Sequence, residues 1–410
     1  MTSNVFSSIT LPNGQQIKNR LVKAAMEENL GNRSLVPDGR LVNLYSKWAQ
    51  GGVGLIITGN VMVDRFAMTG PGGVALEANT ELEGFKRWSE SAKQNDTRVW
   101  MQINHPGRQV FKKMGGKALS ASAVPLDLGK HSGLFDTPRA MTEEEIQDVI
   151  QRFITTAKKA HQAGFDGVEV HAAHGYLLNQ FLSPLTNQRN DQWGGSLENR
   201  ARLLLDIVRG IRKSVPESFA VAVKLNSADF QRGGFDLEDA KNVVSMLNPL
   251  GVDLIEISGG NYEAPAMQGR TADDRTLARE AYFLEFAKDI ATVSQVPVMS
   301  TGGISRHETA EKVIAAGVDL AGIASALAIC PELPNLWQRN SGFTPEIPRP
   351  AWKDKTMSSL AVMSTIRRYL NRWSQNKHHK SLDPLTSLIF DQFRAAKLVR
   401  RYRRTLAQAS

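Results

Sequence analysis

The chain has 410 residues, a net charge of +9 and a single cysteine, Cys330. One cysteine excludes an intramolecular disulfide and a cysteine-ligated metal or iron–sulfur cluster within one chain, so a reducing cytoplasm fits best. The longest uncharged apolar stretch, from Leu320 to Cys330, is too short to cross a bilayer. We therefore expect a cytoplasmic protein without a transmembrane segment.

The positive charge is concentrated at the C-terminus. Residues 351–410 contain 13 Lys and Arg against 3 Asp and Glu, which leaves 37 against 38 for residues 1–350. A body without basic excess has little with which to contact phosphates, so we expect no nucleic-acid partner. The composition also predicts two parts, a domain of residues 1–350 and a basic, helical extension of residues 351–410.

Strand and helix patterns alternate along the chain. The pair Asn13-Gly14 predicts a tight β-hairpin, which we expect to plug the bottom of a barrel. Eight apolar runs are typical of buried strands: 21–25, 53–58, 99–103, 167–170, 219–225, 252–257, 296–300 and 318–323. Helical patterns lie between them at 38–50, 81–94, 142–164, 197–213, 237–247, 277–292 and 307–315. The clearest of these helices begins with a capping box of Thr142 and Glu145.

Eight strands that alternate with helices predict an α/β fold, the (β/α)8 TIM barrel, with functional groups at the carboxyl ends of the strands. A doubly wound open sheet is the competing architecture. It is disfavoured because no Gly-x-Gly-x-x-Gly follows the first strand. The long connection from Asn104 to Met141 is typical of a loop that covers a site.

Residues 168–184 form the candidate active site. The strand pattern ends at His171, which places this residue at the barrel mouth. His174 and Tyr176 follow three and five residues later. The imidazoles can donate hydrogen bonds to a carbonyl or anionic oxygen, and the phenol can supply a proton. Glu169 with the two histidines would also suit a metal-dependent hydrolase. We expect Glu169 to face away from His171, which weakens that alternative.

Other strand ends add groups to the same mouth. The first strand ends in small residues at Ala24 and Ala25, which let a flat ligand lie against the backbone. Gln102 offers an amide, and Lys224 a cation that can stabilise negative charge. Residues 300–305 join the seventh strand to a helix and predict a phosphate seat.

These motifs together resemble the Old Yellow Enzyme family of FMN-dependent NADH:flavin oxidoreductases. The resemblance covers about residues 5–345. It rests on the blocks at 11–26, 54–60, 102–109, 171–184, 193–200 and 300–304, of which 171–184 is the most specific.

The resemblance implies a non-covalent FMN at the barrel mouth, reduced by NADH or NADPH and reoxidised by a small-molecule substrate. His171 and His174 would bind the substrate's carbonyl or nitro oxygen, flavin N5 would deliver hydride to the β-carbon, and Tyr176 would protonate the α-carbon. The residues implied for FMN are Ala24, Ala25, Met26, Glu27, Gly59, Asn60, Gln102 and Lys224 at the ring, and Gly302, Gly303, Ala324 and Ser325 toward the phosphate.

Three positions depart from the family's pattern. Lys224 stands where many relatives have arginine, so the charge remains but the bidentate fork is lost. Glu27 replaces a Thr or Cys that tunes the flavin. Ser325 replaces the arginine that grips the phosphate, and Arg306 is a candidate substitute.

Several alternatives remain open from the sequence. A flavin-linked demethylase or a dienoyl-type reductase would share the same cofactor residues, and a degenerate flavin-binding barrel could act through its basic tail. We expect a homo-oligomer. The tail predicts a basic amphipathic helix that packs on the barrel or another subunit, or that contacts a membrane surface or an acidic partner. Its apolar residues are Leu385, Leu388, Ile389, Phe393 and Leu398.

Overall fold

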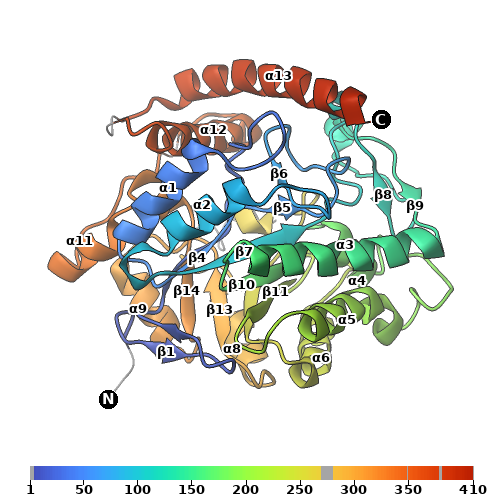
Figure 1. Cartoon of the computed structure of the whole chain (residues 1–410), viewed down its shortest axis with the longest axis horizontal. Coiled ribbons are helices and arrows are strands. Elements are labelled where there is room, and N and C mark those ends of the chain that lie inside the picture. The colour runs from blue at the N-terminus through green and yellow to red at the C-terminus, as the bar shows by residue number, and fades with distance from the viewer. Residues whose placement is uncertain (1–3, 269–279, 349, 378–380, 410) are drawn as a thin grey trace.

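The computed structural model describes residues 4–268, 280–348, 350–377 and 381–409. Its centre is a closed barrel of eight parallel strands (Figure 1). They are β3 (Leu21–Lys23), β4 (Leu55–Ile57), β7 (Arg98–Asn104), β10 (Gly167–Ala172), β11 (Ala220–Asn226), β12 (Leu254–Ser258), β13 (Val298–Thr301) and β14 (Leu320–Ile323). Each strand pairs with the next in this order, and β14 pairs with β3, so the eight strands close into a barrel. The predicted (β/α)8 barrel is confirmed.

Helices surround the barrel where the sequence predicts them. The outer ring contains α1 (Gly39–Gln50), α2 (Glu83–Ala92), α3 (Glu143–Gln162), α5 (Leu197–Ser214), α6 (Leu237–Leu247), α8 (Leu284–Ala291) and α9 (His307–Ala315). The capping box at the start of α3 is present, because Thr142 Oγ1 accepts from the Glu145 backbone N–H and the Glu145 carboxylate accepts from the Thr142 N–H. The helix expected at 277–292 begins only at Leu284; residues 277–279 lie outside the described residues, and 280–283 are not helical.

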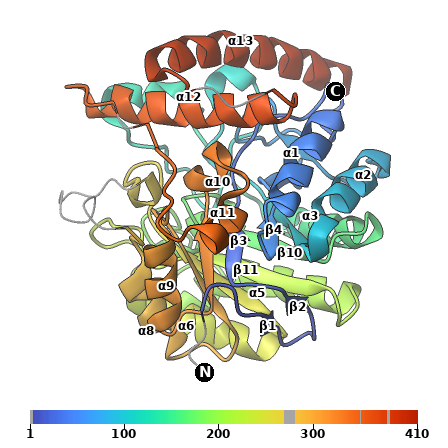
Figure 2. The same ribbon diagram turned by 90° about the vertical axis from the view of Figure 1, so that its left-hand side faces the viewer.

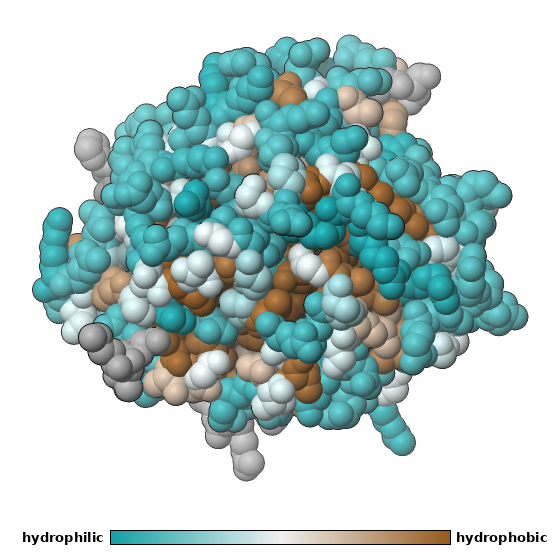
Figure 3. All heavy atoms as spheres, turned by 60° about the horizontal axis from the view of Figure 1, so that its bottom comes forward, coloured by the Kyte–Doolittle hydropathy of each residue, from teal (hydrophilic) through white to brown (hydrophobic). Residues whose placement is uncertain are grey.

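The inside of the barrel has an apolar layer and a polar layer. Strand alternation points Trp100, Ala222 and Leu254 inward, where they pack with Leu11 and Ile17. Ile17 belongs to the hairpin of β1 (Ile9–Thr10) and β2 (Gln16–Ile17), which closes the bottom as predicted. From that end the surface is largely hydrophilic toward its rim, with hydrophobic residues toward its middle (Figure 3).

Two residues further along these strands, the inward positions become polar. Gln102, Glu169, Lys224 and Glu256 are all buried at this level. Burial of polar groups is costly unless they are paired, so this layer indicates a site rather than a core. The barrel is therefore closed and apolar at the hairpin end and polar at the carboxyl ends of its strands.

The chain ends with helices that cross the mouth end of the barrel. They are α10 (Ser325–Ile329), α11 (Leu333–Arg339), α12 (Lys355–Trp373) and α13 (Pro384–Ala409). The last of these, α13, lies over α12 at the end away from the β1–β2 hairpin (Figure 2). Among the described helices, none has the length and apolar character that a membrane span requires.

Side chains of α13 hold the loop that follows the first barrel strand. Arg394 Nη2 donates to the Asn29 carbonyl at 2.5 Å, and Arg401 Nη2 donates to the Gly31 carbonyl at 2.7 Å. The buried Tyr402 hydroxyl donates to the Arg65 carbonyl at 2.7 Å. The extension is thus packed on the barrel through the loops of its mouth.

The apolar residues predicted to share one face of this helix do not do so. Leu388 is buried and Leu398 is half-buried, whereas Leu385, Ile389 and Phe393 are exposed. Successive residues on a helix are about 100° apart, so these five cannot lie on one narrow stripe. The predicted helix is confirmed, but the prediction that these five apolar residues share one face was wrong.

Candidate functional site

The candidate catalytic residues lie together at the end of β10. The His171 ring contacts both the His174 ring, at 5.1 Å between centroids, and the Tyr176 ring, at 4.9 Å, each edge to face. His174 has a φ of 60°, and Gly175 follows at 73°, so the chain turns sharply after the strand. This turn brings three polar rings of one short segment to a common point.

The hydrogen bonds of the two histidines define which nitrogen faces a ligand. His171 Nδ1 accepts from the Ala173 backbone N–H at 3.2 Å, so its Nε2 carries the proton and can donate. His174 Nε2 lies 2.7 Å from Ser258 Oγ, which leaves Nδ1 for a ligand. Burial lowers the pKa of His174 to about 3 and that of His171 well below its ordinary value, and the Lys224 charge acts in the same direction. Both imidazoles are therefore neutral near pH 7.

Tyr176 is buried and has a second phenol beside it. Its hydroxyl lies 3.2 Å from the Tyr262 hydroxyl, which comes from the loop after β12. Burial raises the pKa of Tyr176 well above its ordinary value and that of Tyr262 to about 12, since neither phenolate would be well solvated. Tyr176 is thus protonated over the whole physiological range.

A charged cluster fills the polar layer beneath these rings. Lys224 Nζ lies 2.5 Å from Glu256 Oε1, and Gln102 Nε2 donates to Glu169 Oε1 at 2.7 Å. Burial raises the pKa of Glu169 well above its usual range, and the neighbouring Glu256 adds to this effect. Burial also opposes ionisation of Glu256, but Lys224 holds the pKa of Glu256 below its ordinary value. Burial therefore favours the protonated form of Glu169, and Lys224 balances the charge of Glu256.

The expectation that Glu169 faces away from His171 was wrong. The two residues are separated by one position on β10, and side chains two apart on a strand share a face. Glu169 accordingly points into the barrel toward Gln102. No group of three His, Cys, Asp or Glu side chains suited to hold a metal occurs in the described part of the chain.

Most of the positions implied for FMN are partly exposed at the barrel mouth. The twelve positions come from the ends of six different strands, yet they converge because all eight strands run parallel. The half-buried positions are Ala25, Met26, Glu27, Asn60, Gly302, Gly303, Ala324 and Ser325. Ala24, Gly59, Gln102 and Lys224 lie deeper and are buried. The sequence therefore predicted a set of residues that the fold brings to one opening.

Glu27 is held in place by the loop after β4. Its Oε1 accepts a hydrogen bond from Thr69 Oγ1 at 2.6 Å. Burial raises the pKa of Glu27, and Thr69 and the Arg367 charge of α12 oppose that rise. A Cβ atom on Gly70 would lie 2.5 Å from the same carboxylate oxygen, so a larger residue there would displace the Glu27 carboxylate.

The phosphate end differs from the sequence-based expectation. Gly302 and Gly303 follow β13 with φ of 142° and 72°, and added Cβ atoms would meet the Phe283 and Tyr282 rings at 2.9 and 2.6 Å. The exposed Arg306 is paired with Glu280, at 3.0 Å between Nε and Oε2. The carboxylate neutralises this arginine, so Arg306 is a poor substitute for the cation missing at Ser325.

The structure adds residues that sequence reasoning missed. Ser258 ends β12 and touches His174, and Asn226 ends β11 and accepts from the His174 backbone N–H at 3.1 Å. Both follow the strand-end rule and could have been found with it. Tyr262 lies in a loop, and its local sequence contains no pattern that predicts the contact with Tyr176.

The residues at the ring end fit a flavin. Asn104 ends β7 on the inward face and is fully buried, yet neither atom of its amide has a hydrogen-bond partner among the described residues. Buried amides without partners are rare in proteins and indicate a polar ligand. Gln102 and Lys224, which are also buried inside the barrel, add an amide and a cation.

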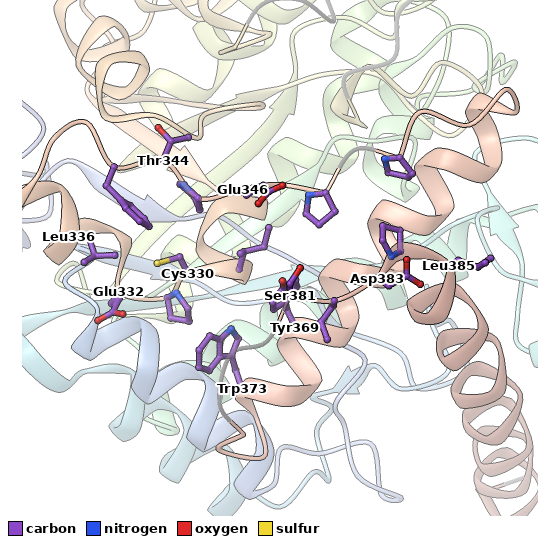
Figure 4. A pocket seen from close by; sticks show the side chains of 18 of the residues that line it. Cys330, Glu332, Leu336, Thr344, Glu346, Tyr369, Trp373, Ser381, Asp383 and Leu385 are labelled. Atoms are coloured by element: carbon purple, nitrogen blue, oxygen red, sulfur yellow. The ribbon is translucent and has the colours of Figure 1, made fainter.

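A hollow lies away from this mouth. It has a volume of about 1410 Å³ and lies where α10 and α11 meet α12 and the start of α13 (Figure 4). Cys330, Tyr369 and Trp373 are part of its wall, whereas His171, His174 and Tyr176 are not. It belongs to the joint between the barrel and the extension.

Comparison with known proteins decides the family. Residues 4–341 match the model of the NADH:flavin oxidoreductase / NADH oxidase family. The chain belongs to this family. An "NADH-dependent flavin oxidoreductase iliE" of Hypocrea jecorina (strain QM6a) is 38% identical over 348 residues, which are 80% of this chain and 86% of that relative.

Two solved structures have the same fold as this chain. A 2-naphthoyl-CoA reductase in complex with 2-naphthoyl-CoA superposes with a TM-score of 0.75 at 27% identity, covering 83% of this chain and 52% of that one. The Old Yellow Enzyme homologue from Zymomonas mobilis superposes with a TM-score of 0.71 at 23% identity, covering 84% and 95%. The predicted Old Yellow Enzyme resemblance and the FMN cofactor of this oxidoreductase family are confirmed.

Proposed function

We propose that the protein is an ene-reductase, which reduces an activated alkene such as an enone, a nitroalkene or a dienoyl-type substrate. The observation that carries this proposal is the contact of two neutral imidazoles and one protonated phenol at the end of β10. The imidazoles can polarise a conjugated double bond by hydrogen-bonding to the substrate's oxygen, and the phenol can complete the reduction by donating a proton.

The residues at the barrel mouth would hold FMN. Gln102, Lys224 and Asn60 would face the ring, with Ala24, Ala25, Met26, Glu27 and Gly59 around it, and Gly302, Gly303, Ala324 and Ser325 toward the phosphate. When bound there, FMN would supply the hydride for the reduction, with NADH or NADPH as the reductant.

The two histidines would bind the electron-withdrawing oxygen of the substrate. His171 donates from Nε2, because Nδ1 is occupied by the Ala173 N–H. His174 donates from Nδ1 when Ser258 donates to Nε2. Because both rings are neutral, they stabilise the developing oxyanion by directed hydrogen bonds and not by a full charge.

Tyr176 would donate the proton to the α-carbon. The raised pKa of Tyr176 keeps the phenol protonated until charge develops on the substrate. Tyr262, 3.2 Å away, can hydrogen-bond to the phenolate that remains and can pass a proton back. Tyr262 is only half-buried, so it would take a replacement proton from solvent and relay it to Tyr176 for the next turnover.

We also propose that residues 1–350 are the FMN-binding domain and residues 351–410 a separate extension of it. The family match over residues 4–341 supports this division.

Spectroscopy and turnover test the function. The purified protein should show a flavin absorption band that NADH or NADPH bleaches, and an enone, nitroalkene or dienoyl thioester should restore it. A flavin band that is bleached but never restored by any of these alkenes would overturn the proposal. Parallel assays with NADH and NADPH identify the reductant.

A further inference from the structure

The outward face of α13 carries large apolar side chains at its start. Leu385, Ile389 and Phe393 recur every fourth residue and are 54%, 51% and 75% exposed, and Phe390 beside them is 59% exposed. Single exposed apolar residues are ordinary, but four within nine positions form a patch that is unusual on a protein surface.

The same face becomes basic in the second half of the helix. Lys397, Arg400, Arg403 and Arg404 are all exposed there. On the opposite face, Arg394, Arg401 and Tyr402 are tied to the barrel loops. The orientation of α13 is therefore fixed by three hydrogen bonds, and its apolar and basic residues are held outward.

The neighbouring helix α12 also carries exposed apolar side chains. Met357, Leu360 and Met363 are exposed on it, and α12 packs along α13 through the Arg367–Asp391 ion pair. The Arg368 guanidinium also lies 4.5 Å from the centre of the Phe390 ring. The exposed apolar side chains thus come from two packed helices at the mouth end of the barrel (Figure 2).

We propose that the outward face of α13, with the adjoining residues of α12, docks onto an anionic lipid surface. The aromatic and aliphatic residues would enter the interfacial region, and the cations would pair with lipid phosphates. A second copy of this chain is a less complete partner, because it could cover the apolar half but would leave the four cations unpaired. An anionic bilayer satisfies both halves of the face at once.

Docking of this kind would orient the catalytic mouth. α13 binds the loop of residues 29–31, which follows β3 at the mouth. A protein bound through α13 would therefore present the mouth end of its barrel to the bilayer, where apolar substrates concentrate.

Vesicle co-sedimentation of the full chain tests this inference. Vesicles of phosphatidylcholine with roughly 30% phosphatidylglycerol should carry the protein down, whereas pure phosphatidylcholine vesicles should carry at least about tenfold less. Raising the salt from about 0.1 M to about 1 M should release most of it, since the screening length falls from about 10 to about 3 Å. Equal sedimentation with both vesicle types, or with neither, would overturn the proposal.

Three variants separate the contributions of the two halves. Ile389→Ser with Phe393→Ser should reduce binding about tenfold or more, and so should the triple variant Arg400→Ser, Arg403→Ser and Arg404→Ser. The control, Gln392→Ser with Ala396→Ser, changes exposed uncharged residues of the same face and should bind like the parent. Far-ultraviolet circular dichroism and thermal unfolding should be unchanged in all three. A stable dimer in light scattering that Phe393→Ser converts to a monomer would also overturn the proposal, because the patch would then be a subunit interface.

Discussion

Lys224 and Glu256 form an ion pair inside the barrel, with 2.5 Å between Nζ and Oε1 and neither side chain more than 3% exposed. Each charge offsets the large free-energy cost of burying the other charge away from water. Lys224→Met should therefore lower the free energy of unfolding by about 3–5 kcal/mol, because it leaves Glu256 ionised without a partner. Urea unfolding of the parent and the variant measures the difference.

The double variant Lys224→Met with Glu256→Leu is the matched control for that prediction. Removing both charges takes away the unpaired carboxylate, so most of the lost stability should return. If the double variant were as unstable as Lys224→Met, packing around Lys224 and not its charge would explain the loss.

The proton-donor role of Tyr176 predicts a selective defect. Tyr176→Phe should slow the reoxidation of reduced flavin by an alkene by about 100-fold or more, since general acids contribute on this scale. Reduction by NADH or NADPH should be nearly unchanged. Stopped-flow absorbance follows the two half-reactions separately, with Tyr262→Phe as a milder comparison. Equal loss in both half-reactions would argue against proton donation by Tyr176.

The two histidines should bind phenolic ligands through the phenol oxygen. His171→Ala combined with His174→Ala should weaken such binding by about 10- to 100-fold, which corresponds to the loss of one or two hydrogen bonds to a charged oxygen. Flavin absorbance titrations measure the affinity. His161→Ala, an exposed histidine at the end of α3, is the control and should leave it unchanged. Unaltered affinity in the double variant would refute the oxyanion assignment.

The missing arginine at the phosphate end predicts a gain of function. Ser325→Arg should tighten FMN about tenfold, because it adds a cation where Arg306 is already paired with Glu280. Fluorescence quenching of FMN on titration with the apoprotein measures this. Ser325→Gln, with similar length and no charge, is the control. No tightening by arginine would show that the phosphate is neutralised by another group.

We predict that the buried His105 makes the folded protein less stable in acid. It is buried, its Nδ1 accepts from the Gly107 backbone N–H at 3.1 Å, and burial lowers the pKa of His105 to about 4. Below pH 6.5 the unfolded chain binds a proton that the folded chain does not, so stability falls as the pH drops from 6.5 toward 4. The contribution over this window is about 3 kcal/mol.

The variant His105→Asn isolates that contribution. Asparagine keeps an acceptor for the Gly107 N–H but does not titrate, so its unfolding free energy should depend less on pH between 6.5 and 4. Urea unfolding at several pH values checks this, with the exposed His161→Asn as a control. Parallel pH profiles for the parent and His105→Asn would contradict the prediction.

Local patterns in the sequence were sufficient for the barrel and for most of the mouth. Apolar runs located all eight strands, and parallel strands place their carboxyl ends together, so Gln102, His171 and Lys224 could be assigned to one site. The hairpin at Asn13 and the helix start at Thr142 followed from turn and capping chemistry.

The remaining features depend on contacts between distant segments. Tyr262 reaches Tyr176 only through the path of the loop after β12, which no local pattern specifies. The pairing of Arg306 with Glu280 likewise arises from residues that meet only in the folded chain. For α13, composition indicated a helix, but which side faces the barrel was decided by Arg394, Arg401 and Tyr402.

The hold of α13 on the loop after β3 has a consequence for biosynthesis. Residues 29–31 emerge early from the ribosome, but their partners Arg394 and Arg401 are made about 365 residues later. The barrel strands are all made before α13, so the first mouth loop stays without these two hydrogen bonds until α13 has been synthesised. Completion of the catalytic opening therefore waits for α13 to fold back over the loop that follows β3.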